Sequence, residues 1–131
     1  MKLSSQKLAS PLLLFAASFL TAQVPFATKT TEVMVLIAAK PGVQREQIIK
    51  LAQEEARATV RLYLDGKISQ WYSRSDGRGI ILIVKAKSVA EAQAITESLP
   101  LSKANLVDHE FTELGPLGPL HNLIDGPPLK Q

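Results

Sequence analysis

The 131-residue sequence contains no cysteine, and this absence excludes several classes of protein at once. A chain without cysteine has no disulfide framework, no lipid attached at a lipobox cysteine and no covalent catalysis by a thiol. Serine is present, but no serine stands in the sequence context of a nucleophile elbow. The folded domain must therefore be held together by packing alone.

Histidine is scarce, because only His109 and His121 occur. No further ligand is spaced to join them in a zinc or iron site, so we expect no metal and no bound cofactor. Clusters of lysine and arginine are short as well, with none longer than two residues. A nucleic-acid-binding surface needs concentrated positive charge, so we do not expect nucleic acid as a partner.

The first 22 residues have the layout of a secretory signal peptide. Lys2 and Lys7 precede the apolar run Leu12–Leu20, and the small residue Ala22 follows. We predict cleavage after Ala22, with Ala27 as the second choice, and export to the periplasm or the medium. An uncleaved membrane anchor is the alternative, but the apolar run is shorter than the ~20 residues of a spanning helix. Cleavage lowers the formal net charge from +3 to +1, because it removes two lysines and no acidic residue.

The rest of the chain has the patterns of one globular domain, residues 32–117, after a short lead-in, residues 23–31. The expected elements are, in order, strand 32–39, helix 43–64, strand 68–74, strand 80–86, helix 89–99 and strand 106–114. The tail, residues 118–131, is rich in glycine and proline, which disfavour regular structure. The apolar residues from Leu117 to Ile124 are expected to lie against the domain or a neighbouring subunit.

Two strands, Val33–Ala39 and Ile80–Val84, are apolar at every position. Such strands are buried on both faces, which places them at the centre of a four-stranded antiparallel sheet. With two helices on one face of that sheet, the other face must be buried by a partner. The sequence therefore predicts a homodimer that associates through the open sheet face.

Local patterns predict how single elements pack. The first helix has apolar residues at four-residue intervals that are expected to face the sheet, namely Ile48, Ala52, Ala56, Val60 and Leu64, and the stripe is widened by Ile49, Leu51 and Tyr63. Alternation in the strand from 68 to 74 is expected to place on one face Ile68, Gln70, Tyr72 and Arg74. A capping box of Ser88 and Glu91 is expected to start the second helix, and Pro100 is expected to close it.

Three features of the domain, taken together, are typical of one protein superfamily. They are the order β-α-β-β-α-β, the link Leu64–Ile68 into an edge strand with Trp71, and the segment Leu99–Ala104 that leads to a last strand and Leu114–Leu117. Together they resemble the dimeric α+β barrel superfamily, in particular its muconolactone isomerase-like and YciI-like branches. The resemblance implies a ferredoxin-like α+β domain with two helices on one face of its sheet, which pairs with a second copy to close a barrel. It also implies a ligand site in a cleft between sheet and helices of each subunit.

The site residues of these branches do not carry over to this chain. Muconolactone isomerase has a histidine at the start of its third strand, where this sequence has Gly77-Arg78-Gly79. The YciI-like branch has a pair of histidine and aspartate, whereas Asp108 and His109 here lie on the last strand in a different motif. Candidate residues must therefore be chosen by their chemistry.

Three residues are candidates for proton transfer. His109 and Glu55 are candidate bases, and Tyr72 is a candidate hydrogen-bond donor to a substrate oxygen. His109 shares its strand face with Val107 and Phe111, which points it toward an interior or an interface. The structural alternative for His109 is a ring that is paired with a backbone carbonyl or a carboxylate in the core.

Three further residues are candidates for binding a ligand. Arg61 and Arg74 could each hold the carboxylate of a small acid by a bidentate contact, or be solvated surface charges. Trp71 could provide an aromatic wall. Because Trp71 and Tyr72 lie on opposite faces of one strand, we expect at most one of them to line a given cleft.

Three hypotheses for the function follow. The first is an exported muconolactone isomerase-like domain that binds a small organic acid or lactone, with isomerisation by cofactor-free proton transfer as a further step. The second is a non-catalytic dimerisation or accessory module, and the third is a haem- or flavin-using oxidoreductase of the same superfamily. A polar-lined cleft that contains His109 or Tyr72 favours the first hypothesis. A cleft filled by leucine and isoleucine side chains favours the second.

Overall fold

The computed structural model describes residues 28–118 and residue 124. The chain forms, in order, β1 (Glu32–Ala39), α1 (Arg45–Leu64), β2 (Ile68–Ser73), β3 (Ile80–Val84), α2 (Val89–Thr96), α3 (Pro100–Lys103) and β4 (Val107–Leu114). This is the expected order of elements with one added helical turn, α3. The signal peptide expected in residues 1–22 lies outside the described residues. Among the described residues, no helix has the length and apolar character needed to cross a membrane.

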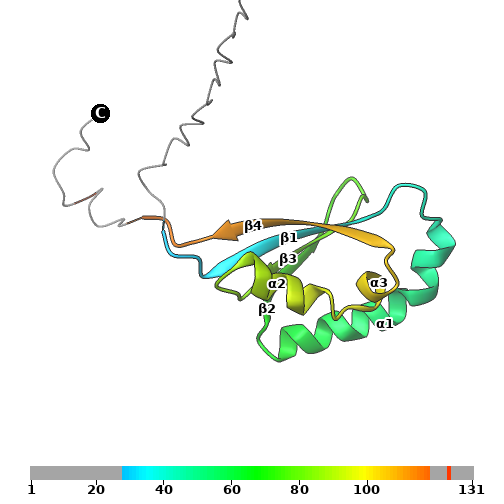
Figure 1. Ribbon diagram of the computed structural model, residues 1–131, viewed down its shortest axis with the longest axis horizontal. Coiled ribbons are helices and arrows are strands. Elements are labelled where there is room, and N and C mark those ends of the chain that lie inside the picture. The colour runs from blue at the N-terminus through cyan, green and yellow to red at the C-terminus, as the bar shows by residue number, and fades with distance from the viewer. Residues whose placement is uncertain (1–27, 119–123, 125–131) are drawn as a thin grey trace, which may run out of the picture.

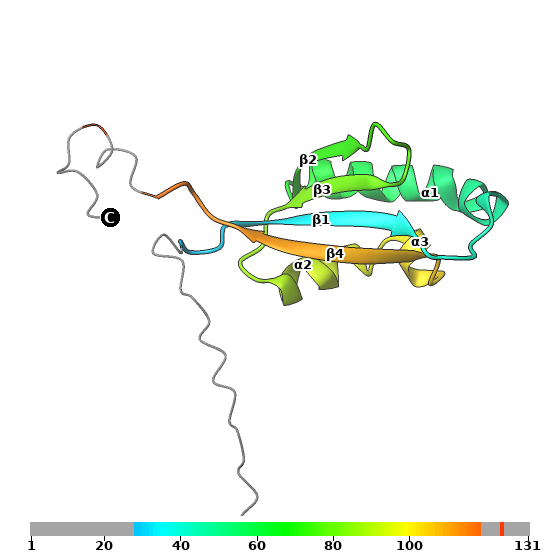
Figure 2. The same cartoon turned by 90° about the horizontal axis from the view of Figure 1, so that it is seen from above.

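One four-stranded antiparallel sheet organises the domain, with the strand order β2-β3-β1-β4. The two wholly apolar strands, β1 and β3, are the central ones, as predicted. Figure 1 and Figure 2 show α1, α2 and α3 on the same face of this sheet. The ferredoxin-like α+β fold is thus confirmed.

The two faces of the central strands differ in what covers them. Buried side chains face the helices and form the centre of the core: Val33, Val35, Ile37, Leu82 and Val84. The alternate residues of the same strands form what we call the open face: Met34, Leu36, Ala38, Ile81 and Ile83. These five are half-buried in the single chain, and no helix of the described residues lies over them (Figure 1). Both faces are therefore apolar, as the sequence pattern predicted.

A β-bulge in β2 changes which of its residues share a face. Ile68 and Gln70 pair with successive residues of β3, so the register shifts between them. Ile68 is consequently buried under the helices, whereas Gln70 and Tyr72 pair with residues of the open face. The prediction that these three share a face is wrong, because the bulge inserts one residue. Trp71 and Tyr72 do lie on opposite faces.

Helix α1 packs on the core through only two residues of the apolar stripe predicted for it, Ile48 and Leu51. An α-helix turns by about 100° per residue, so positions four apart drift by about 40° at every step. This drift carries the last member away from the sheet, and Leu64 is 75% exposed. The residues that pack on the core or are buried follow a mixed spacing of three and four: Ile48, Leu51, Glu55, Ala58, Thr59 and Leu62. Two polar residues therefore occupy the middle of the buried face.

The connection from α2 to β4 also differs from the expectation. Ser88 caps α2 by accepting the Glu91 N–H at 3.2 Å, but the Glu91 carboxylate accepts the N–H of Lys87 and does not close the box at Ser88. Helix α2 ends at Thr96, and Pro100 does not simply close it but stands first in α3. Proline suits that position because the first N–H of a helix has no partner within the helix.

The tail was expected to lie against the domain or a neighbouring subunit. Shortly before the tail, Gly115 approaches the lead-in so closely that an added Cβ would meet the Thr28 Oγ1 atom at 2.1 Å. Leu117 and Ile124 are 78% and 84% exposed, so these two do not pack on their own domain. Contact with a neighbouring subunit stays a prediction, and residues 119–123 and 125–131 lie outside the described part.

Candidate functional site

A cleft of about 920 Å³ opens between α1 and the sheet. Its walls come from the end of β1, the inner side of α1, the end of β2 and the turn that follows, and the start of β3. Leu101 of α3 and Val107 of β4 also line it. The volume falls within the range of sites that hold small molecules, and the position is the one that the family resemblance implies.

The cleft exists because α1 presents small side chains to this part of the sheet. Ala52 and Ala56 line the cleft and are exposed to it. Both belong to the stripe that was expected to pack on the sheet, but a methyl group is too short to fill the space between a helix and a sheet. Larger apolar residues at these two positions would close the space.

Glu55 is the one acidic residue among those that line the cleft. It lies at the centre of the buried face of α1 and is only 7% exposed. Its Oε2 atom accepts the backbone N–H of Leu101 at 2.8 Å, which is a first-turn N–H of α3 without a partner inside that helix. Burial raises the pKa of the Glu55 carboxyl above its ordinary value of 4.5, and the Leu101 hydrogen bond opposes this rise.

The second oxygen of Glu55, Oε1, is available to a ligand. It makes no hydrogen bond with any described residue, yet no buried side-chain nitrogen or oxygen in the described part of the chain lacks a partner. Oε1 is therefore not fully buried, and Glu55 is one of the residues that line the cleft. A carboxyl with a raised pKa in a mostly apolar cleft is a candidate for a general acid or base.

The end of β2 brings two more predicted residues to the cleft. Trp71 faces the helices, and its ring lies 5.7 Å from that of Tyr63. Tyr72 borders the cleft as well, so the expectation that only one of the two could do so is wrong: an edge strand leaves its margin open to both sides. The Tyr72 hydroxyl donates a hydrogen bond to Gln70, which lies on the same face of the strand.

Arg74, the third predicted residue at the cleft, is held by the turn after β2. Its guanidinium pairs with the Asp76 carboxylate. The other oxygen of Asp76 accepts the backbone N–H of Arg78 at 2.9 Å. This backbone hydrogen bond, together with Arg74, holds the pKa of Asp76 below its usual range. The turn is thus fixed by one carboxylate.

Two cleft residues, Arg45 and Arg78, were missed by the sequence reasoning. Arg45 is the first residue of α1, and Arg78 lies in the turn between β2 and β3. Both side chains are exposed. Nothing in the spacing of the sequence separates them from ordinary surface charges, because only the folding of the turn against the start of α1 brings them to one cleft.

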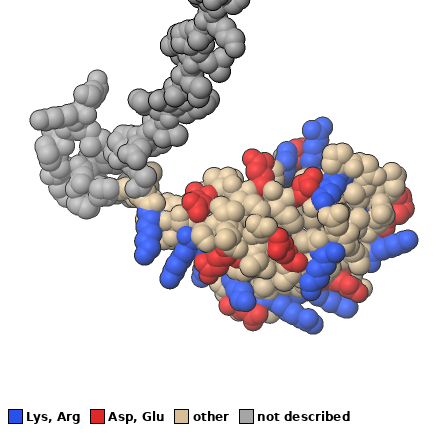
Figure 3. Space-filling model, viewed as in Figure 1, with Lys and Arg blue, Asp and Glu red and all other residues tan. Residues whose placement is uncertain are grey.

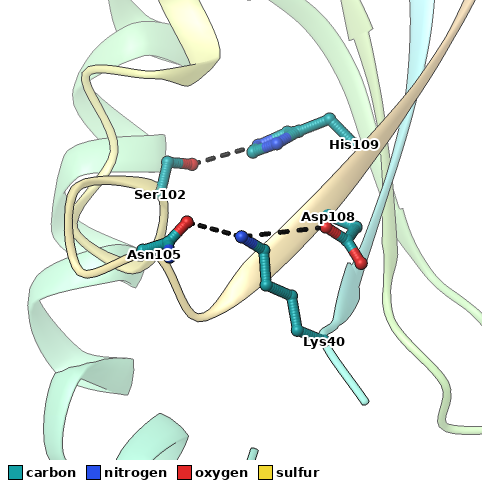
Figure 4. Close-up of polar contacts among 5 residues, drawn as sticks. All are labelled: Lys40, Ser102, Asn105, Asp108 and His109. Atoms are coloured by element: carbon teal, nitrogen blue, oxygen red, sulfur yellow. Dashed lines mark hydrogen bonds and ion pairs between the residues drawn. The ribbon is translucent and has the colours of Figure 1, made fainter.

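His109 does not line the cleft. It faces the helices from β4, as predicted, and stacks on Phe111 with ring centroids 5.9 Å apart. Its Nε2 atom lies 3.0 Å from the Ser102 Oγ atom, as Figure 4 shows. Burial lowers the pKa of His109, and the nearby charges of Glu97 and Asp108 oppose this effect. The contact between His109 and Ser102 thus joins β4 to α3, and we call such a contact between these two parts of the chain a tether.

A second tether lies beside the first (Figure 4). The Lys40 ammonium donates to the side-chain oxygen of Asn105 and lies 3.9 Å from an Asp108 oxygen. Asn105 follows α3 with a positive φ of 58°, a conformation that asparagine tolerates better than most residues. The candidate pair Asp108 and His109 is therefore split, since neighbouring strand residues point to opposite faces.

Arg61 also lies outside the cleft, so four of the six predicted site residues come together: Glu55, Trp71, Tyr72 and Arg74. Within residues 28–118, no group of three histidine, aspartate or glutamate side chains could hold a metal ion. On the face shown in Figure 3, positive and negative side chains are interspersed and do not form a patch of one sign.

Comparison with known proteins found one kind of similarity, a similar fold among solved structures. No family model matches the sequence, and no curated protein does. Among solved structures, the chain is similar to 5-chloro-2-hydroxyhydroquinone dehydrochlorinase (TftG) from Burkholderia phenoliruptrix AC1100, in a complex with 2,5-dihydroxybenzoquinone. The TM-score is 0.53 at 19% sequence identity, and the match covers 64% of this chain and 93% of that chain. At this identity the likeness shows the ferredoxin-like fold alone.

The raised pKa of Glu55 predicts how stability depends on pH. The folded chain binds this proton more tightly than the unfolded chain does, so the free energy of unfolding falls as pH rises from about 4.5 through the folded pKa. Glu55→Gln keeps an oxygen for the Leu101 N–H and removes the titration. We expect the variant to become more stable relative to the wild type as pH rises from about 4.5 through the folded pKa of Glu55, by about 1.4 kcal/mol per pH unit between the two pKa values.

Urea unfolding at several pH values measures this difference. Glu54→Gln is the matched control, because it removes the same charge from an exposed position on the same helix. If the wild type instead becomes more stable relative to Glu55→Gln as pH rises, the raised pKa of Glu55 is wrong.

Proposed function

We propose that this protein binds a small organic acid or lactone in the cleft between α1 and the sheet, and isomerises it by cofactor-free proton transfer. The observation that carries this proposal is Glu55, a carboxyl with a raised pKa that lines a cleft of about 920 Å³ and uses only one of its two oxygens in a hydrogen bond to a described residue. Its position on a helix, held by Leu101, keeps the reactive oxygen in one place.

The chemistry that this geometry supports is a shift of one proton between two carbons. The Glu55 carboxylate takes a proton from the carbon beside the ligand carbonyl, and the bonding electrons move into the carbonyl to give an enolate. The protonated Glu55 then returns the proton to another carbon of the conjugated system, which moves the double bond and restores the carboxylate. Burial favours the neutral acid, so the carboxylate is a stronger base than an exposed glutamate.

The other cleft residues have supporting roles in this proposal. Trp71 provides a flat apolar wall for a ring of the ligand. Thr59 also lines the cleft, but its hydroxyl donates a hydrogen bond to the Glu55 backbone carbonyl at 2.8 Å and so is not available to donate to a ligand. The accessory-module hypothesis expects a cleft filled by leucine and isoleucine. An open cleft that contains Glu55, Tyr72 and arginine side chains supports ligand binding instead, and no specific observation favours the haem or flavin hypothesis.

Muconolactone is the probe for the proposed reaction, because the family resemblance points to it. We expect the protein to exchange or move a ring proton of muconolactone in D2O, visible as a changing proton NMR spectrum. Glu55→Gln should slow this reaction by at least ~100-fold, the usual weight of a general base. Glu54→Gln should retain the wild-type rate, and equal rates for the two variants would count against Glu55 as the base.

We also propose that two copies pair through the open face. In the single chain this face leaves five apolar side chains half-exposed on the two central strands. Ile81→Lys places a charge in the middle of the face and should convert a dimer into a folded monomer, as measured by light scattering and circular dichroism. Leu64→Lys is the control, because Leu64 is an exposed apolar residue at the end of α1. A wild type that is monomeric at micromolar concentration would overturn the pairing.

Export of the protein is part of the same proposal. We expect the processed chain to begin at Gln23, after cleavage that follows Ala22. Intact mass measurement on the protein from the periplasm or medium tests this, because a start at Gln23, at Thr28 or at Met1 gives three different masses. A chain that still begins at Met1 would support the uncleaved anchor.

A further inference from the structure

Two arginine side chains, Arg45 and Arg78, border the cleft from facing walls. Arg45 begins α1, and Arg78 lies in the turn between β2 and β3. Figure 1 and Figure 2 both place this turn and the start of α1 at the same end of the domain. The two arginines therefore belong to the same end of the cleft.

Neither guanidinium has an acidic partner in the described part of the chain. The two ion pairs found there join Lys40 to Asp108 and Arg74 to Asp76. Asp76 lies near Arg78, but its oxygens are taken up by the Arg74 guanidinium and by the Arg78 backbone N–H. The cleft thus has two guanidinium groups at one end that form no ion pair with a described residue, although Arg78 lies close enough to Asp76 to help lower its pKa. Burial raises the pKa of Glu55, the one acidic residue among the cleft-lining residues.

The start of α1 adds to this positive potential. The unpaired N–H groups of a helix of this length give its first turn a partial positive charge, and Arg45 stands in that turn. The cleft walls are mostly apolar, so they screen an ion less than bulk water does. A carboxylate at this place meets two guanidinium groups that form no ion pair with any described residue.

We infer that Arg45 and Arg78 bind the acid group of the ligand, and that the cleft selects cyclic carboxylic acids over their neutral analogues. The acid group lies between the two guanidiniums, and the ring extends along Trp71 toward Glu55. Arg74 and Arg61, the arginines expected from the sequence, do not fill this role, because Arg74 is bound to Asp76 and Arg61 lies outside the cleft. This inference rests on the proposed function of the cleft as a ligand site.

The chain offers an internal probe for this inference, because Trp71 is its single tryptophan and lines the cleft. Cyclohexanecarboxylate and cyclohexanecarboxamide have the same ring and nearly the same shape, and neither absorbs where tryptophan is excited. We expect both to change the Trp71 fluorescence of the processed protein, with the carboxylate at least ~10-fold tighter. Sodium chloride at 0.5 M should weaken the binding of the carboxylate and leave the binding of the amide unchanged.

Single variants test which arginines are responsible. Arg45→Gln and Arg78→Gln should each lower the affinity for cyclohexanecarboxylate by about ten-fold, because one charged hydrogen-bonding partner is lost. The affinity for the amide should change by less than about two-fold. Arg61→Gln is the matched control, because it removes the same charge from α1 outside the cleft. Circular dichroism confirms that each variant is folded, which both exposed positions should permit.

The outcomes separate this inference from the proposal beneath it. Equal affinity for the acid and the amide, or an equal loss in Arg61→Gln, would overturn the role of Arg45 and Arg78 and leave the cleft as a ligand site. If neither compound changes the Trp71 signal at millimolar concentration, both the arginine pair and ligand binding in the cleft are wrong.

Discussion

The two apolar faces of β1 and β3 set the conditions for everything else in this domain. Alternate residues of a strand point to opposite faces, so strands that are apolar throughout must be covered on both. Three helices in one layer cover the first face and bury a core around Val33, Val35 and Leu82. The second face stays apolar across the two central strands, and polar residues such as Gln70 and Glu110 limit it at the outer strands. The open face of the sheet is therefore apolar, and no described residue of the same chain forms a layer that covers it.

The cleft exists because the side chains of α1 do not fill the space between this helix and the sheet. A helix that used large apolar residues along its whole buried face would fill the space, but α1 has Ala52 and Ala56 beside the cleft and Glu55 and Thr59 at the centre of its buried face. The hydrogen bond from Leu101 to Glu55 compensates part of the cost of burying a carboxyl. The same contact joins α1 to α3, so one side chain serves both the structure and the proposed reaction.

Helix α3 is the element that links the cleft to the rest of the core. Glu55 accepts its Leu101 N–H on one side, and His109 meets its Ser102 hydroxyl on the other. A single turn of helix has little stability of its own, so these contacts decide where it lies. The similar fold of TftG does not extend this reasoning to a reaction, because a ferredoxin-like domain supports many functions and only the residues of the cleft can distinguish them.

The sequence by itself determined the order of strands and helices, the central place of β1 and β3 and the apolar character of both sheet faces. These properties follow from periodicity and composition within each segment, which act over a few residues. Tertiary structure alone decided the bulge in β2, the true buried face of α1 and the place of His109 outside the cleft. It also decided that Arg45 and Arg78 share a cleft, because residues 33 positions apart meet only when a turn and a helix start fold to the same end of a sheet. Local patterns carry no information about such a meeting, since it depends on how whole elements pack.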